Sequence, residues 1–185
     1  RKLLANEEVS NAVIFCNRKR DIGILYRSLL KHGFNAAELH GDLPQSSRTS
    51  TLNRFKSGDI QLLIASDVAA RGLDIADLSH VVNFDVPSNA EDYVHRIGRT
   101  GRAGKKGKAF TFVTSEDEKY IEAITALIKK PIETLNDHEK QKTSQTSIEK
   151  QRSTPIRPSP STAALAPPWH AQKHIPRPVL VPRRR

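Results

Sequence analysis

Short apolar runs alternate with amphipathic segments over the first 130 residues of the chain. The apolar runs have the length of buried strands, and we expect strands at residues 12–16, 35–39, 60–65, 80–84 and 108–113. The segments between them carry apolar residues at helical spacing, which predicts helices at residues 21–30, 44–56, 90–97 and 115–129. Strands separated by helices indicate βαβ units, so the pattern predicts an α/β fold whose parallel sheet has helices on both faces.

Local signals define the ends of two of these helices. Gly33 follows the first helix and is a natural C-terminal stop. Ser115, with Glu118 three residues later, predicts a capping box at the start of the last helix. In parallel α/β folds the functional loops lie at the carboxyl ends of the strands, so we expect the chemistry of the protein there.

The composition of the chain changes after residue 132. From Arg152 onward there are seven basic residues and no acidic residue, and eight of the eleven prolines lie between Pro155 and Pro182. Such a segment cannot bury enough apolar surface to offset the entropy lost on ordering, and its prolines disfavour helices and central strands. We therefore expect a folded domain at residues 1–132 and a disordered, basic, proline-rich tail at residues 133–185. The tail suits a polyanion such as nucleic acid; a solubilising extension without a partner is the alternative.

Several features limit the class of protein. The longest unbroken apolar runs are four or five residues, as at residues 62–65, which excludes a membrane span, and no signal-peptide pattern opens the chain. The single cysteine, Cys16, cannot form an internal disulfide or a cysteine-based metal site, which suits a cytoplasmic protein. The chain starts at Arg1 and contains no methionine, so we expect a fragment of a longer protein.

The loop at residues 66–74 follows the third expected strand directly. A carboxylate shortly after a glycine, as in Gly72 and Asp74, suits a ribose hydroxyl, while Ser66 and Arg71 can donate hydrogen bonds to phosphate. Aspartate and glycine are also ordinary loop residues, so a plain connecting loop is an alternative at this point.

Residues 95–102 hold three arginines and two glycines where a helix gives way to a loop. Like charges three residues apart on a helix repel each other, so arginine at positions 96, 99 and 102 favours an anion as the common partner. The guanidinium group is permanently charged and planar, and it can grip phosphoryl oxygens through two N–H groups. The alternative is a solvated basic turn.

Six short blocks occur in order along the folded part, at residues 13–17, 40–42, 45–48, 66–74, 82–87 and 95–102. Through these blocks, residues 1–130 closely resemble the C-terminal RecA-like domain of DEAD-box ATP-dependent RNA helicases. The resemblance implies a RecA-like parallel sheet and the C-terminal motor domain of an enzyme that separates short RNA duplexes with RNA-stimulated ATP hydrolysis. The basic tail looks most like that of bacterial members, of the RhlE-like branch.

The resemblance also implies roles for individual positions. Arg99 and Arg102 match the arginine fingers that reach ATP on the other RecA-like domain, and they are the expected catalytic residues. Asp74, with Gly72 beside it, matches the aspartate that hydrogen-bonds the ribose. Three positions match residues that couple the ATP side to the RNA side: Arg71, His95 and Arg96. Four match positions that hold the RNA backbone: Asn17, Gly41, Arg48 and Ser66.

The chain has no phosphate-binding loop of the G-x-x-x-x-G-K-[ST] type and no Asp-Glu-Ala-Asp sequence. The resemblance implies that ATP and Mg²⁺ are bound mainly by an N-terminal RecA-like domain of the same protein, so we expect no metal site here. The expected partners are RNA and the N-terminal RecA-like domain. We expect no binding to a membrane. Two other classes stay open: an RNA-binding module without catalysis, and the motor domain of a DNA helicase or translocase.

Overall fold

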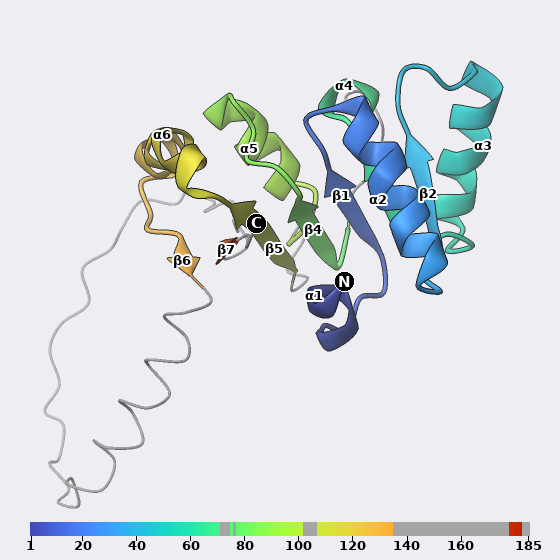
Figure 1. The fold of residues 1–185 in the computed structure, drawn as a ribbon, viewed down its shortest axis with the longest axis horizontal. Coiled ribbons are helices and arrows are strands. Elements are labelled where there is room, and N and C mark those ends of the chain that lie inside the picture. The colour runs from blue at the N-terminus through green and yellow to red at the C-terminus, as the bar shows by residue number, and fades with distance from the viewer. Residues whose placement is uncertain (71–74, 76, 102–106, 135–177, 183–185) are drawn as a thin grey trace, which may run out of the picture.

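The computed structural model describes residues 1–70, 75, 77–101, 107–134 and 178–182. Its centre is one parallel sheet in the order β2-β3-β1-β4-β5-β7-β6 (Figure 1). The strands are β1 (Ala12–Phe15), β2 (Ala36–Leu39), β3 (Leu62–Ala65), β4 (His80–Asn83), β5 (Lys108–Val113), β6 (Glu133–Thr134) and β7 (Pro178–Pro182). The helices are α1 (Lys2–Asn6), α2 (Lys19–Lys31), α3 (Gln45–Lys56), α4 (Asp67–Ala70), α5 (Ala90–Ile97) and α6 (Glu118–Ile128). The predicted α/β fold with a parallel sheet is confirmed.

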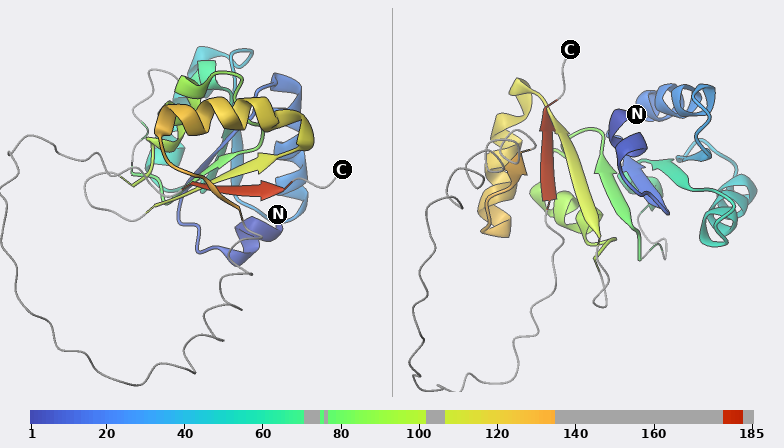
Figure 2. Two further views of the ribbon diagram at one scale, coloured as in Figure 1. Left: turned by 90° about the vertical axis from the view of Figure 1, so that its left-hand side faces the viewer. Right: turned by 90° about the horizontal axis from the view of Figure 1, so that it is seen from below.

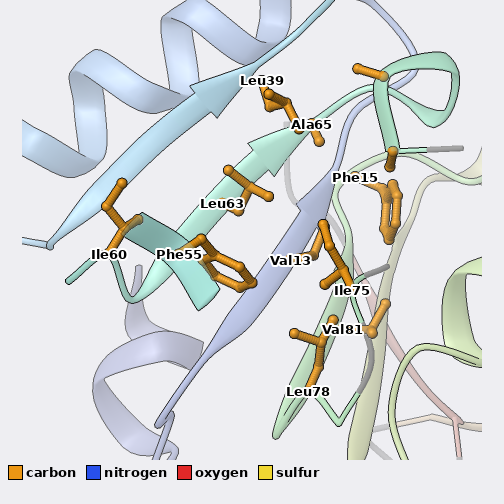
Figure 3. Packing of buried hydrophobic residues seen from close by; sticks show 12 residues of the cluster. Val13, Phe15, Leu39, Phe55, Ile60, Leu63, Ala65, Ile75, Leu78 and Val81 are labelled. Atoms are coloured by element: carbon orange, nitrogen blue, oxygen red, sulfur yellow. The ribbon is translucent and has the colours of Figure 1, made fainter. Parts of the chain in front are cut away.

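Alternation along the strands divides the apolar side chains between the two faces of the sheet. In β1, Val13 and Phe15 pack on the face covered by α3 and α4, together with Phe55 of α3 (Figure 3). Ala12 and Ile14 pack on the opposite face, against Ile22 of α2 and other residues of α1 and α2. The helices α5 and α6 pack against β5, in a third cluster that includes Tyr93, Ile97, Ala109 and Ile124. The expected coverage of both faces is therefore confirmed.

Two helix ends test the local signals. Gly33 has φ +77° just after α2, a backbone conformation that favours glycine, so the expected stop is confirmed. The capping box is present but lies one residue earlier than expected: Thr114 and Asp117 form it, and not Ser115 and Glu118. The Oδ2 atom of Asp117 accepts hydrogen bonds from the backbone N and the Oγ1 of Thr114 at 2.8 and 2.7 Å. The first turn, Ser115–Asp117, is a 3-10 helix, so the helical region begins at Ser115 and its cap is Thr114.

The expectation of disorder throughout residues 133–185 was wrong for the two segments that form β6 and β7. Strand β7 pairs with β5 along its whole length, from Ala109 opposite Pro178 to Val113 opposite Pro182 (Figure 2). Its central residues, 179–181, are Val-Leu-Val, a sequence that favours a strand. The two prolines stand at its ends, where a missing N–H disturbs the ladder least. Residues 135–177 and 183–185 of the predicted tail lie outside the described residues.

The helices in the described part of the chain are all too short or too polar to cross a lipid bilayer.

Replacement of Leu180 tests whether β7 is a stable part of the sheet. Leu180 is only 7% exposed and lines a cleft together with Ile121 and Thr125 of α6. We expect Leu180→Ala to lower the free energy of unfolding by about 2 kcal/mol, because it leaves a cavity between β7 and α6. Urea denaturation of the 185-residue chain measures this.

Leu127→Ala is the matched control, because Leu127 lies on the same helix α6 and is 48% exposed. It should change the stability by less than about 0.5 kcal/mol. Equal unfolding midpoints for the Leu180 variant and the unaltered chain would contradict a stabilising β7.

Candidate nucleotide and nucleic-acid interface

The parallel sheet brings several of the predicted site residues to one edge. Asn17 follows β1, Gly41 follows β2 and Ser66 follows β3, so all three lie beyond the carboxyl ends of neighbouring strands (Figure 1). Arg96 lies on α5, which follows β4 in the chain. This is the edge at which ligands bind in open parallel sheets, and the structure places four of the predicted residues around it.

Arg96 is the most deeply buried charged residue of this edge, with 2% exposure. Its guanidinium group forms a two-pronged ion pair with Asp67, the first residue of α4: Nε lies 2.7 Å from Oδ1 and Nη2 lies 2.5 Å from Oδ2. It also lies over the ring of Phe15, 5.1 Å from its centroid. Arg96, which was predicted to couple the ATP side to the RNA side, is therefore held inside the protein by the carboxylate of Asp67.

The remaining N–H groups of Arg96 reach the loop after β1, the last residue of β4 and the loop after β4. Nη2 donates to Asn17 Oδ1 at 2.8 Å, and Nη1 donates to Asn83 Oδ1 at 3.3 Å and to the backbone oxygen of Asp85 at 3.0 Å. A guanidinium group has five N–H donors, and each of them here has an acceptor. One side chain thus joins the segments that follow β1, β3 and β4.

Asn17 has both ends of its side-chain amide engaged within the protein. Its Oδ1 accepts from Arg96, and its Nδ2 donates to the backbone oxygen of Val86 at 2.8 Å. The backbone N of Asn17 donates to Asp85 Oδ2 at 3.1 Å. Asn17 therefore connects the loop after β1 to the loop after β4, and a contact between this amide and RNA stays a prediction.

The other predicted RNA-binding residues lie farther out. Gly41 is exposed, and nothing lies within 4 Å of the position that a Cβ atom would take. The next residue, Asp42, accepts a hydrogen bond from Lys19 Nζ at 2.5 Å, and this bond lowers the pKa of the Asp42 carboxyl group. Arg48, on α3, donates from Nη1 to Gln45 at 3.0 Å. Within the described part of the chain, its buried Nε atom has no hydrogen-bond partner.

Ser66 lies at the start of α4, and its hydroxyl oxygen accepts from the backbone N of Ala69 at 3.4 Å. His95 is exposed on α5, and Arg99 is half-buried two residues after the end of that helix. The predicted residues Arg71, Gly72, Asp74 and Arg102 lie outside the described residues. Of the predicted ATP-facing groups, the structure therefore places Arg99 alone.

Sequence reasoning missed the partners of Arg96, namely Asp67, Asn83 and Asp85. All three lie inside the blocks at residues 66–74 and 82–87, but nothing in a single sequence pairs them with an arginine on another element. It also missed a cleft of about 650 Å³ at the same edge, lined by Asn17 and Asp85 together with the basic residues Arg18, Arg20 and Lys119. Among the described residues, no group of three acidic, histidine or cysteine side chains could hold a metal ion.

Residues 1–104 match the family described as Helicase conserved C-terminal domain, and the chain belongs to that family. Within it, the chain is homologous to the C-terminal domains of DEAD-box ATP-dependent RNA helicases. It is 44% identical over 147 residues to ATP-dependent RNA helicase DBP8 of Lodderomyces elongisporus, covering 80% of this chain and 33% of that protein. It is 42% identical over 136 residues to DEAD-box ATP-dependent RNA helicase CshA of Bacillus subtilis, covering 74% of this chain and 28% of that protein.

Solved structures agree with this assignment. The E. coli DEAD-box protein SrmB, bound to regulator of ribonuclease activity A, matches with a TM-score of 0.67 and 38% identity, covering 71% of this chain and 77% of that chain. The C-terminal domain of the DEAD-box protein Dbp5 matches with a TM-score of 0.65 and 35% identity, covering 69% and 74%. These structures confirm the predicted RecA-like fold. The chain spans about a third, or less, of the length of the helicases named above.

Removal of Arg96 tests the importance of the buried ion pair. Arg96→Gln leaves the carboxylate of Asp67, whose side chain is 23% exposed, without its counter-ion. Removal of one partner of a buried pair costs about 3–5 kcal/mol, and we expect the lower end because Asp67 keeps some contact with water. Urea denaturation measures the change in the free energy of unfolding.

Arg20→Gln is the control for loss of one positive charge. The side chain of Arg20 is 75% exposed and lies 3.6 Å from Asp21, so this change should alter the stability by less than about 0.5 kcal/mol. A comparable loss in both variants would mean that net charge, and not the buried pair, is responsible.

Proposed function

We propose that this chain is the C-terminal motor domain of an ATP-dependent RNA helicase. It binds the RNA backbone and supplies Arg99 and Arg102 as arginine fingers to ATP held by an N-terminal RecA-like domain of the same protein. The main support is the position of Arg99, two residues after the end of α5 and three residues after the buried Arg96, whose guanidinium group joins the segments that follow β1, β3 and β4. The relatives that share this domain are named as ATP-dependent RNA helicases.

The proposed mechanism is closure of the cleft between two domains. ATP and single-stranded RNA bind across both domains, and closure brings Arg99 and Arg102 to the γ-phosphate. Their guanidinium groups stabilise the negative charge that develops as the phosphoryl group is transferred to water. Mg²⁺ neutralises phosphate charge in such reactions, and we place it with ATP on the N-terminal domain, because the Asp-Glu-Ala-Asp sequence that marks this family does not occur in this chain.

On the RNA side we assign the backbone to Gly41, Arg48 and Ser66, with Asn17 holding the loop beside them. The open space at Gly41 permits close approach of a phosphate, and the buried Nε of Arg48 is an unused donor within the described part. Contacts to phosphate and sugar carry no base information, so the expected binding is independent of sequence. Closure bends the bound strand and releases its partner, and hydrolysis then resets the cleft.

We also propose a cytoplasmic location and a bacterial, RhlE-like origin, from the single cysteine and the basic C-terminal composition. The similar proteins come from yeasts, plants and bacteria alike. The sequence of the whole protein would test the bacterial, RhlE-like origin.

Replacement of Arg99 in a protein that carries both RecA-like domains tests the proposed function. Arg99→Ala should lower kcat for RNA-stimulated ATP hydrolysis by about 10³-fold, because an arginine finger acts mainly on the charge of the transition state. ATP binding should change little. Arg99→Lys should not restore kcat, since an ammonium group cannot form the two-pronged contact. Phosphate release at saturating RNA and ATP measures kcat.

Arg27→Ala, at an exposed position on α2, is the matched control and should keep kcat. Near-normal turnover by Arg99→Ala would contradict the arginine-finger assignment. Stimulation by DNA in place of RNA would favour a DNA helicase or translocase, and absence of ATP hydrolysis in the unaltered two-domain protein would favour an RNA-binding module.

The basic residues of the C-terminal segment provide a second test, of electrostatic RNA binding. Because β7 belongs to the sheet, the charges are better removed by substitution than by truncation. If about half of them contact phosphates of a single strand, replacing all seven with Gln should flatten the slope of log K against log salt by about 2–3 units. The residues are Arg152, Arg157, Lys173, Arg177, Arg183, Arg184 and Arg185.

RNA-binding titrations at several salt concentrations measure this slope. The control replaces the six arginines of this set with lysine, which keeps every charge and should keep the slope. Identical slopes for the glutamine and unaltered chains would show that this segment serves a protein partner or only solubility.

A further inference from the structure

The segment that runs from Ser66 to Leu78 is attached to the segment around α5 at two points. At its beginning, Asp67 forms the ion pair with Arg96. At its end, Leu78 forms an isolated parallel bridge with Thr100, three residues after α5. The first attachment is a buried ion pair, and the second is a small set of hydrogen bonds next to Arg99.

The second attachment uses both polar groups of the Leu78 backbone. The N–H of Leu78 donates to the backbone oxygen of Arg99 at 3.2 Å. The carbonyl oxygen of Leu78 accepts a hydrogen bond from the hydroxyl of Thr100. Leu78 is 2% exposed and Thr100 is 1% exposed, so both bonds are made by groups that are shielded from water. We call this pair the Leu78–Thr100 latch.

Two glycines allow the chain to pack around the latch. Gly101 has φ +68°, a conformation that side chains rarely adopt. Gly107 lies so close that a Cβ atom there would overlap the hydroxyl of Thr100 and would stand 2.7 Å from the backbone N of Gly101. The latch is therefore closed in on the side of Gly107 and cannot take a larger residue there.

The result is a fixed backbone at Arg99. Its N–H donates to the backbone oxygen of Arg96 at 3.1 Å, and its carbonyl oxygen accepts from Leu78. Both polar groups of the Arg99 backbone are thus bonded, one to the helix that holds Arg96 and one to the latch. A side chain that acts on a transition state must be held to within a fraction of an ångström of its productive position. A fixed backbone at Arg99 limits the positions that its side chain can take.

We propose that Thr100 and Leu78 are positioning residues, which hold the backbone of Arg99 so that its side chain meets the γ-phosphate in the closed state. This inference rests on the proposed role of Arg99. The hydroxyl of Thr100 does not act on ATP or RNA in this proposal. It fixes the loop that carries Arg99 against the end of the segment that begins at Ser66.

Thr100→Val in the protein that carries both RecA-like domains is the direct test. Valine has nearly the shape of threonine but puts a methyl group against the Leu78 carbonyl, so the bond is lost. We expect kcat for RNA-stimulated ATP hydrolysis to fall by about 10- to 100-fold, as small misplacements of a catalytic group do. The KM values for ATP and RNA should stay within about twofold, because an arginine finger contributes mainly to the transition state. Thr100→Ser keeps the hydroxyl and should recover most of the kcat that valine loses.

Thr125→Val is the matched control for loss of a threonine hydroxyl. Its Oγ1 donates to the backbone oxygen of Ile121 at 2.8 Å, within α6 and outside the candidate site. This variant should keep kcat. An equal loss of kcat in Thr125→Val would overturn the proposal, because the effect would then be a general loss of stability.

Amide hydrogen exchange of Leu78 and Arg99 in the 185-residue chain tests the latch apart from ATP chemistry. Exchange at Leu78 should accelerate in Thr100→Val and stay slow in Thr100→Ser. If Thr100→Val does not fold, Thr100→Ala removes the same donor without a methyl group facing the Leu78 carbonyl and replaces it in both assays.

The outcomes separate this inference from the proposed function. Faster exchange with unchanged kcat in Thr100→Val, while Arg99→Ala is strongly impaired, would overturn the positioning role and leave the arginine finger in place. Unchanged kcat in both variants would overturn the proposed function itself. Unchanged exchange at Leu78 would overturn the latch.

Discussion

The ion pair between Arg96 and Asp67 is the interaction on which the rest of the carboxyl edge depends. The guanidinium group has five N–H donors, and they meet five acceptors, in Asp67, Asn17, Asn83 and Asp85. A lysine could offer only three donors from one atom. Because the acceptors lie at the end of β4 and in the segments after β1, β3 and β4, a single buried charge sets the relative positions of three loops. Burying such a charge costs free energy, and the buried ion pair fixes the geometry of the loops at this edge.

That geometry explains how a residue that touches neither ATP nor RNA in the proposed mechanism can couple their sites. Ser66, assigned to RNA, directly precedes Asp67, and Arg99 follows Arg96 by less than one helical turn. In the proposed mechanism, the ion pair is the link through which a displacement of the loop at Ser66 would reach the helix that precedes Arg99. In this account Arg96 acts through packing and hydrogen bonds inside one domain, and the ligands are contacted by its neighbours.

Most of the fold could be predicted from the sequence, because buried strands and amphipathic helices differ in period. Helix α5 and strand β5 have the predicted bounds. Strand β7 was missed because three apolar residues between prolines are hidden in a segment whose average composition is polar and basic. For the site, the arginines at 96, 99 and 102 predicted phosphate as a common partner, which stays a prediction for Arg99 and Arg102. Arg96 is instead paired with Asp67, 29 residues earlier in the chain, and only the tertiary structure could reveal this pairing.

The two attachments of the segment from Ser66 to Leu78 differ in chemistry, and this difference suits different tasks. The ion pair with Asp67 is strong and joins many acceptors, so it defines where α5 lies relative to the sheet. The Leu78–Thr100 latch consists of neutral hydrogen bonds to backbone groups, which are sensitive to distance and angle. An arginine that must stabilise charge only in the transition state gains from a backbone that is already in position, because no reorganisation is then needed as the reaction proceeds. Helix α5 thus sets where the loop that carries Arg99 lies, and the Leu78–Thr100 latch fixes the direction of its backbone.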